Sequence, residues 1–114
     1  LVYAEDISRI RKLGSKVAKV AADMMEFHAA SHKASYGMEG DPTQDACAVA
    51  YLLEPEIFMT KNCYVEVDVT WGPSRGQTVV DFHNVLGRAP NVEVVYNVDR
   101  EKFVNLLYHG LAKY

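Results

Sequence analysis

The spacing of apolar residues along the chain predicts helices first, then strands, then one last helix. Residues 5–13 carry apolar side chains every three residues, and Gly14 supplies a residue suited to ending a helix. A longer helix is predicted from Lys16 to about Ser35, with Ser15 as its N-cap, and a short helix from Asp45 to Leu53. The apolar stripe predicted for the long helix consists of Val17, Val20, Ala21, Met24 and Phe27.

In the second half of the chain the period changes to two, which is typical of half-buried strands. Strands are predicted at residues 63–70, 78–82 and 91–98, and the short loops between them favour antiparallel pairing. Asp99 is then placed to cap a closing helix. The pattern alone predicts an α+β arrangement of three helices, three strands and a helix, and it specifies no function.

Composition narrows the class of protein. The chain has 114 residues, the size of one domain or of part of a larger one, and its net charge is −3. No basic cluster exceeds the pair Arg11-Lys12, which argues against a nucleic-acid partner. No apolar run is long enough to cross a bilayer and no signal peptide opens the chain, so no membrane partner is expected. Cys47 and Cys63 show no CxxC spacing, and free thiols in the cytoplasm are expected.

A polar group of residues spans the predicted long helix and the loop after it. His28, His32 and Tyr36 recur every four residues, so they project from nearly one face of the helix. Gln44 and Asp45 follow a loop containing glycine and proline that can fold back over this face. Imidazoles suit proton transfer near neutral pH, and a carboxylate suits a hard cation or sugar hydroxyls. These five side chains can therefore converge on a polar ligand.

Simpler interpretations of the same residues stay open. Histidines at a frayed helix end are often exposed without a function, and the carboxylate of Asp45 can act as a helix N-cap. The His28–His32 spacing can also bind zinc, but no third ligand follows at a suitable distance. His83 and His109 lie in no ligand pattern.

Three segments carry a resemblance to a known family. QDACAVAYLLEPEIFMTKNCYVEVDV, SRGQTVVDF and APNVEVVYNVDREKFVNLL follow one another in the order found in inosine-uridine nucleoside hydrolases. The chain resembles the C-terminal portion of these enzymes from about residue 5 to its end. The resemblance implies an α/β fold in which residues 1–114 are the C-terminal fragment of a Rossmann-type hydrolase domain, with its N-terminal calcium-binding part absent.

The resemblance also implies an activity and a set of site residues. Such enzymes hydrolyse the N-glycosidic bond of purine or pyrimidine ribonucleosides, and a calcium ion held by carboxylates binds the ribose diol and the attacking water. The position of Asp45 in the motif implies that it is the last calcium carboxylate. His28 and Tyr36 are implied as substrate-binding residues of the base pocket. The apolar residues 46–53 are expected to be buried behind Asp45 and to fix its position.

One residue departs from the family pattern. The histidine that protonates the departing base in many members is replaced here by Gln44, whose amide can donate a hydrogen bond but cannot deliver a proton. Three consequences stay open. His32 or His28 supplies the proton, with Gln44 and His32 expected as the catalytic pair; or stacking and hydrogen bonds activate the base; or this member is weak or inactive.

The expected function is therefore a ribonucleoside hydrolase that is active only together with the N-terminal part of the same enzyme. A homo-oligomer is expected from the family, and purine or pyrimidine preference is not specified. One alternative is a non-catalytic relative that binds nucleosides or only assembles with other chains. The other is an α+β domain whose polar cluster lies on the surface without a function.

Overall fold

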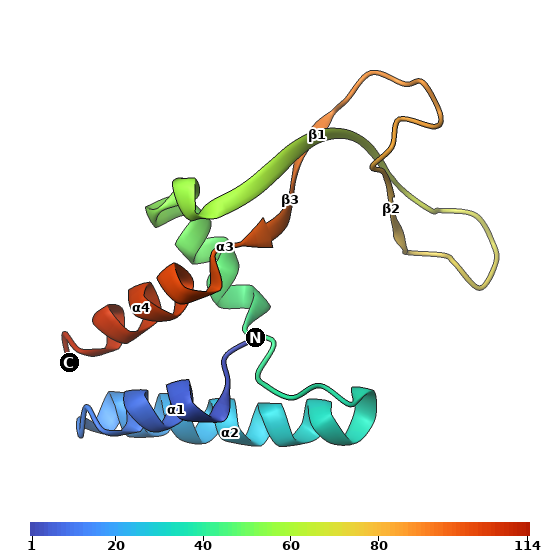
Figure 1. Ribbon diagram of the computed structural model, residues 1–114. Helices are drawn as coiled ribbons and strands as arrows, with labels where there is room; N and C mark the ends of the chain where they lie inside the picture. Colours follow the sequence, from blue (N-terminus) through green and yellow to red (C-terminus); the bar gives the residue numbers. More distant parts are fainter. The chain divides into compact units, whose positions relative to one another are not determined.

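The computed structural model describes residues 1–114, which form two compact units. The first unit comprises Leu1–Ile57 and Asp99–Tyr114 and holds all four α-helices, whereas the second comprises Phe58–Val98 and holds the sheet (Figure 1). The order of helices, antiparallel strands and closing helix confirms the α/β fold class expected from the sequence. No helix combines the length and apolar character needed to cross a membrane.

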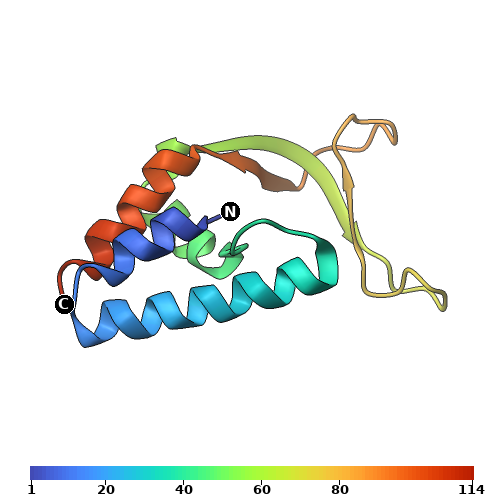
Figure 2. The same ribbon diagram turned by 60° about the horizontal axis from the view of Figure 1, so that its bottom comes forward.

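The first two helices of the helical unit form a hairpin. Helix α1 covers Ala4–Arg11 and helix α2 covers Lys16–Tyr36, and the two lie side by side (Figure 2). Ser15 caps α2 as predicted, since its hydroxyl accepts a hydrogen bond from the backbone N–H of Ala18 at 3.1 Å. Gly37 ends the helix in the left-handed conformation, with φ of 69°. The core of the hairpin consists of Ile7, Ile10, Ala18, Ala22 and Met25.

The apolar stripe predicted for α2 is not the face that packs in this chain. Met24 is 67% exposed and Phe27 is 79% exposed, and Val17 and Val20 are exposed as well. Helix α1 instead covers the neighbouring stripe of small residues that includes Ala18 and Ala22, because small side chains allow two helix axes to approach. Met24 and Phe27 therefore face away from the core of this unit, whereas Met25 packs into it.

The remaining helices of this unit are α3, Gln44–Leu53, the short 3₁₀ helix η1, Pro55–Ile57, and α4, Arg100–Leu111. Asp99 caps α4 as predicted, because its carboxylate accepts a hydrogen bond from the backbone N–H of Lys102 at 3.2 Å. Helix α3 contacts both η1 and α4.

Two predictions about α3 are wrong. Asp45 is not the N-cap, since the helix begins at Gln44 and Thr43 holds the cap position without a capping hydrogen bond from its side chain. The apolar segment behind Asp45 is not buried either: Leu52 is 81% exposed, Leu53 and Val49 are also exposed, and Ala50 alone in this helix is buried. The apolar run of α3 indicated a buried helix, but its large side chains stay exposed in this chain.

The second unit is an antiparallel sheet in the order β2-β1-β3. Its strands are β1, Phe58–Val67, β2, Thr78–Asp81, and β3, Val92–Val98. The three predicted strands and their antiparallel pairing are confirmed, but β1 begins at Phe58 rather than Cys63 and ends before Asp68. The strand ends there because the Asp68 carboxylate accepts hydrogen bonds from Thr70 and Ser74 and so forms a turn.

The chain start and the loop before α3 are tied together in the helical unit. Val2 and Asp41 exchange two backbone hydrogen bonds, each of 2.9 Å. Gly40 permits this approach, because a Cβ at this residue would lie 2.8 Å from the carbonyl oxygen of Val2. The pairing fixes Asp41 beside α2.

Candidate functional site

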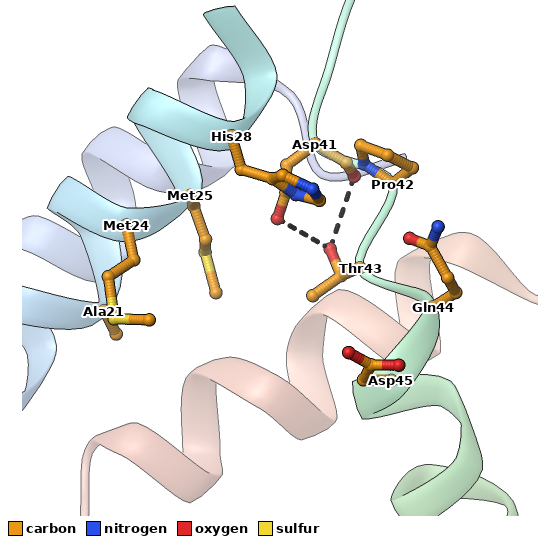
Figure 3. Close-up of a pocket in the computed structure, with 9 residues that line it drawn as sticks. All are labelled: Ala21, Met24, Met25, His28, Asp41, Pro42, Thr43, Gln44 and Asp45. Atoms are coloured by element: carbon orange, nitrogen blue, oxygen red, sulfur yellow. Dashed lines mark hydrogen bonds and ion pairs between the residues drawn. The ribbon is translucent and has the colours of Figure 1, made fainter. Parts of the chain in front are cut away.

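A pocket of about 320 Å³ opens between the middle of α2 and the loop that leads into α3 (Figure 3). Three of the five predicted site residues line it: His28 from α2, and Gln44 and Asp45 from the first turn of α3. The other lining residues are Ala21, Met24, Met25, Asp41, Pro42 and Thr43. The pocket thus combines an apolar wall from α2 with a polar rim from residues 41–45.

The closest polar contact of the pocket joins His28 to Asp41. The Nδ1 atom of His28 lies 2.5 Å from Oδ1 of Asp41, and the Asp41 residue is only 2% exposed. The hydroxyl of Thr43 donates to the second carboxylate oxygen of Asp41 at 3.0 Å. Figure 3 shows His28 and Thr43 against the same aspartate. A buried carboxylate must have such partners, because leaving it without them costs several kcal/mol, about 1–3 per unmade hydrogen bond.

The other two predicted residues lie further along α2 and do not line the pocket. The ring of His32 lies edge-on to that of His28, with 4.1 Å between the ring centroids, and Tyr36 lies 5.4 Å beyond His32. The Nδ1 atom of His32 is 3.1 Å from the backbone oxygen of His28. The predicted i, i+4, i+8 series therefore exists as a row of rings, and only its first member reaches the pocket.

Asp45 is exposed in the first turn of α3, and no hydrogen bond or ion pair engages its carboxylate. A free carboxylate is the type of oxygen donor that calcium prefers, so Asp45 fits the role of a calcium ligand. No cluster of three or more His, Cys, Asp or Glu side chains in residues 1–114 could hold a metal ion. Calcium takes about 6–8 oxygen ligands, and no group of acidic side chains in residues 1–114 joins Asp45 to supply them.

The sequence interpretation missed Asp41 and Thr43. Asp41 stands in the segment Gly40-Asp41-Pro42, which predicts a turn, and a turn aspartate is usually exposed. The signal that could have found it is the separation of 13 residues from His28, which a helix followed by a returning loop can bring into contact.

Comparison with known proteins places this geometry in a family. The model of the inosine-uridine preferring nucleoside hydrolase family matches residues 1–105. The chain belongs to this family. The motif residues Gln44 and Asp45 therefore stand on the pocket wall of a nucleoside hydrolase fold.

Relatives within the nucleoside hydrolase family match almost the whole chain. A pyrimidine-specific ribonucleoside hydrolase, RihA, of Klebsiella pneumoniae is 41% identical over 114 residues, which are 99% of this chain and 37% of the relative. The RihA of Photobacterium profundum is 40% identical with the same coverage. The chain thus spans little more than a third of the length of the curated relatives it matches.

Solved structures agree on the fold. A purine-preferring ribonucleoside hydrolase from Gardnerella vaginalis superposes with a TM-score of 0.72 at 29% identity, covering 99% of this chain and 37% of that chain. A plant nucleoside hydrolase superposes with a TM-score of 0.79 at 22% identity, covering 96% of this chain and 36% of that chain, and supports the fold alone.

Proposed function

We propose that these residues supply part of the active site of a ribonucleoside hydrolase, which cleaves the N-glycosidic bond to give ribose and a free base. The observation that carries the proposal is the pocket in which His28, Gln44 and Asp45 meet, within a chain that belongs to the nucleoside hydrolase family. The names of the RihA relatives support pyrimidine ribonucleosides as the first substrates to test.

Asp45 is proposed as a ligand of Ca²⁺. Its carboxylate is exposed at the pocket and free of other partners, so binding a cation breaks no existing hydrogen bond. When bound, calcium supplies a hard cation that binds hydroxyl oxygens of the ribose. The residues of this chain then position the nucleoside: Met24 and Met25 offer apolar surface to the base, and Gln44 offers an amide that can donate or accept a hydrogen bond.

A further part of the same enzyme is proposed to complete the site and to cover the exposed apolar surface. Met24 and Phe27 of α2 and Leu52 of α3 are large apolar side chains that water surrounds here. Large apolar side chains that are exposed in this way are typical of a surface that another part of a protein covers. The other calcium donors, which residues 1–114 lack, are proposed to come from the part that covers this surface. Assembly into a homo-oligomer, with action in the cytoplasm, completes the proposal.

The experiment measures ribose release by the complete polypeptide that contains these residues, with uridine, cytidine and inosine as substrates. Asp45→Asn should lower calcium affinity at least about 10- to 100-fold, the effect seen for weaker perturbations of metal sites, and ribose release should fall with it. Glu56→Gln is the matched control, because Glu56 is an exposed carboxylate outside the pocket. Unchanged calcium affinity and turnover in Asp45→Asn would refute the metal assignment.

The rival is a non-catalytic family member that binds nucleosides, and Gln44 is the observation that favours it, since an amide cannot act as the acid. Isothermal calorimetry with uridine, run beside the ribose assay, separates the two. Binding without any ribose release, in the presence of calcium, would establish the rival.

A further inference from the structure

The pair formed by His28 and Asp41 is a built arrangement that the family motif at Gln44 and Asp45 does not explain. Its carboxylate is buried, and its only ion-pair partner is the imidazole of His28. Thr43 and the backbone pairing with Val2 hold the aspartate from the other side. No arginine or lysine contacts Asp41, so His28 is the side chain with which this carboxylate forms an ion pair.

The contact with Asp41 determines which ring nitrogen of His28 is free for proton transfer. Nδ1 is the atom that faces Asp41, and an ionised carboxylate can only accept, so Nδ1 carries a hydrogen that it donates. The other nitrogen, Nε2, has no hydrogen-bond partner in this chain, and His28 lines the pocket. A buried carboxylate that orients an imidazole and fixes its tautomer is a recurring device of proton-transfer sites.

We propose that His28 protonates the departing base through Nε2, and that Asp41 is the positioning residue for this histidine. The proposal rests on the ribonucleoside hydrolase function proposed above. It gives His28, assigned from the sequence to substrate binding, the proton transfer that Gln44 cannot perform and that the sequence left open between His32 and His28.

The bond between C1′ of the ribose and the base nitrogen breaks, and its electron pair goes to the base, which takes the proton from Nε2 of the His28 imidazolium. The oxygen of a water molecule forms the new bond to C1′. This water loses one proton to solvent, and solvent returns one proton to Nε2, so the sum is nucleoside plus water giving ribose plus base.

His32 is less suited to this role. It does not line the pocket, no carboxylate contacts it, and its Nδ1 lies against the backbone oxygen of His28. It differs from His28 in these respects while lying one helical turn away. His32→Asn is therefore the matched control for His28→Asn.

The test compares two substrates in the complete polypeptide: uridine, whose base leaves well only when protonated, and p-nitrophenyl β-ribofuranoside, whose phenolate leaves without a proton. His28→Asn should lower kcat on uridine about 10²- to 10⁴-fold, the usual contribution of a general acid, and change kcat on the nitrophenyl substrate less than about threefold. His32→Asn should change neither by more than about threefold. Circular dichroism verifies that each variant is folded.

Asp41→Asn gives an independent readout that a structural role would not move. The amide of asparagine can donate to Nδ1, so the neutral ring of His28 should move its hydrogen to Nε2, visible in the ¹⁵N chemical shifts of labelled histidine. Turnover of uridine should fall with KM nearly unchanged, while the nitrophenyl substrate is still cleaved.

The opposite results would overturn the acid assignment, the positioning role of Asp41 or the proposed hydrolase function. Equal losses on both substrates in His28→Asn, or no loss on uridine, would overturn the acid assignment. An unchanged ¹⁵N pattern in Asp41→Asn would overturn the positioning role. If the unmodified protein with calcium cleaves the nitrophenyl substrate but not uridine, the acid assignment fails; if it cleaves neither, the proposed hydrolase function itself fails.

Discussion

Replacing Gly40 by alanine places a methyl group where the loop before α3 approaches the start of the chain. The new Cβ would lie 2.8 Å from the carbonyl oxygen of Val2, 3.0 Å from Cδ1 of Tyr3 and 3.2 Å from Cβ of Leu1. The first of these atoms belongs to the backbone, so it cannot rotate away as a flexible side chain would. The loop or the N-terminal segment must shift instead.

The cost follows from what this shift disturbs. Forcing an extra methyl group into a packed site costs about 1–3 kcal/mol. Loss of the two hydrogen bonds between Val2 and Asp41 adds about 0.5–1.5 kcal/mol for each bond that breaks. Against this, alanine reduces the entropy of the unfolded chain and returns about 0.4–1 kcal/mol. With both hydrogen bonds broken, we expect a net loss of about 1–6 kcal/mol in the free energy of unfolding.

Urea denaturation of the complete polypeptide measures this loss, and amide hydrogen exchange shows whether it is local. The amides of Val2 and Asp41 should exchange faster in Gly40→Ala. Gly110→Ala is the control, since its added Cβ has no neighbour within 4 Å beyond the adjacent residues and the backbone of its own helix, and alanine favours the helix by up to about 1 kcal/mol. Stability of Gly40→Ala equal to that of Gly110→Ala would refute the steric argument.

Three other predictions concern a buried side chain, a thiol and a turn. Ile10→Ala should lower the free energy of unfolding, measured by urea denaturation, by about 2–5 kcal/mol, because the side chain of Ile10 in α1 is fully buried. A loss below about 1 kcal/mol would contradict its place in the core. Burial raises the pKa of the Cys47 thiol, so its alkylation by iodoacetamide should be slower than that of free cysteine at neutral pH and should accelerate as the pH rises; an equal rate at neutral pH would contradict this. Hydrogen bonds from Ser74 and Thr70 hold the pKa of Asp68 below its ordinary value of 3.8, so the stability that this turn contributes is present above that value and is lost as the pH falls through the lowered pKa. The difference in urea midpoint between the unmodified protein and Asp68→Asn should therefore vanish in acid, and a difference that persists there would refute the assignment.

The sequence by itself determined the elements and the family. Ser15 and Asp99 cap α2 and α4 as predicted, because capping depends on residues only three positions apart. The alternation in the second half predicted the three strands, and the chain connections favoured antiparallel pairing. The choice of β1 rather than β2 as the partner of β3 was not specified by the sequence pattern. The motif around Gln44 and Asp45 indicated the family that residues 1–105 match.

The tertiary structure decided which of the apolar and polar faces are used. Helix α2 carries two apolar stripes, and no local pattern shows that α1 covers Ala18 and Ala22 while Phe27 stays exposed. No local pattern shows the role of Asp41 either. The sequence places this residue in a turn, but its backbone pairs with Val2 and its buried carboxylate contacts His28. Such contacts join residues far apart in the chain, so they depend on packing and on the closure of loops rather than on periodicity.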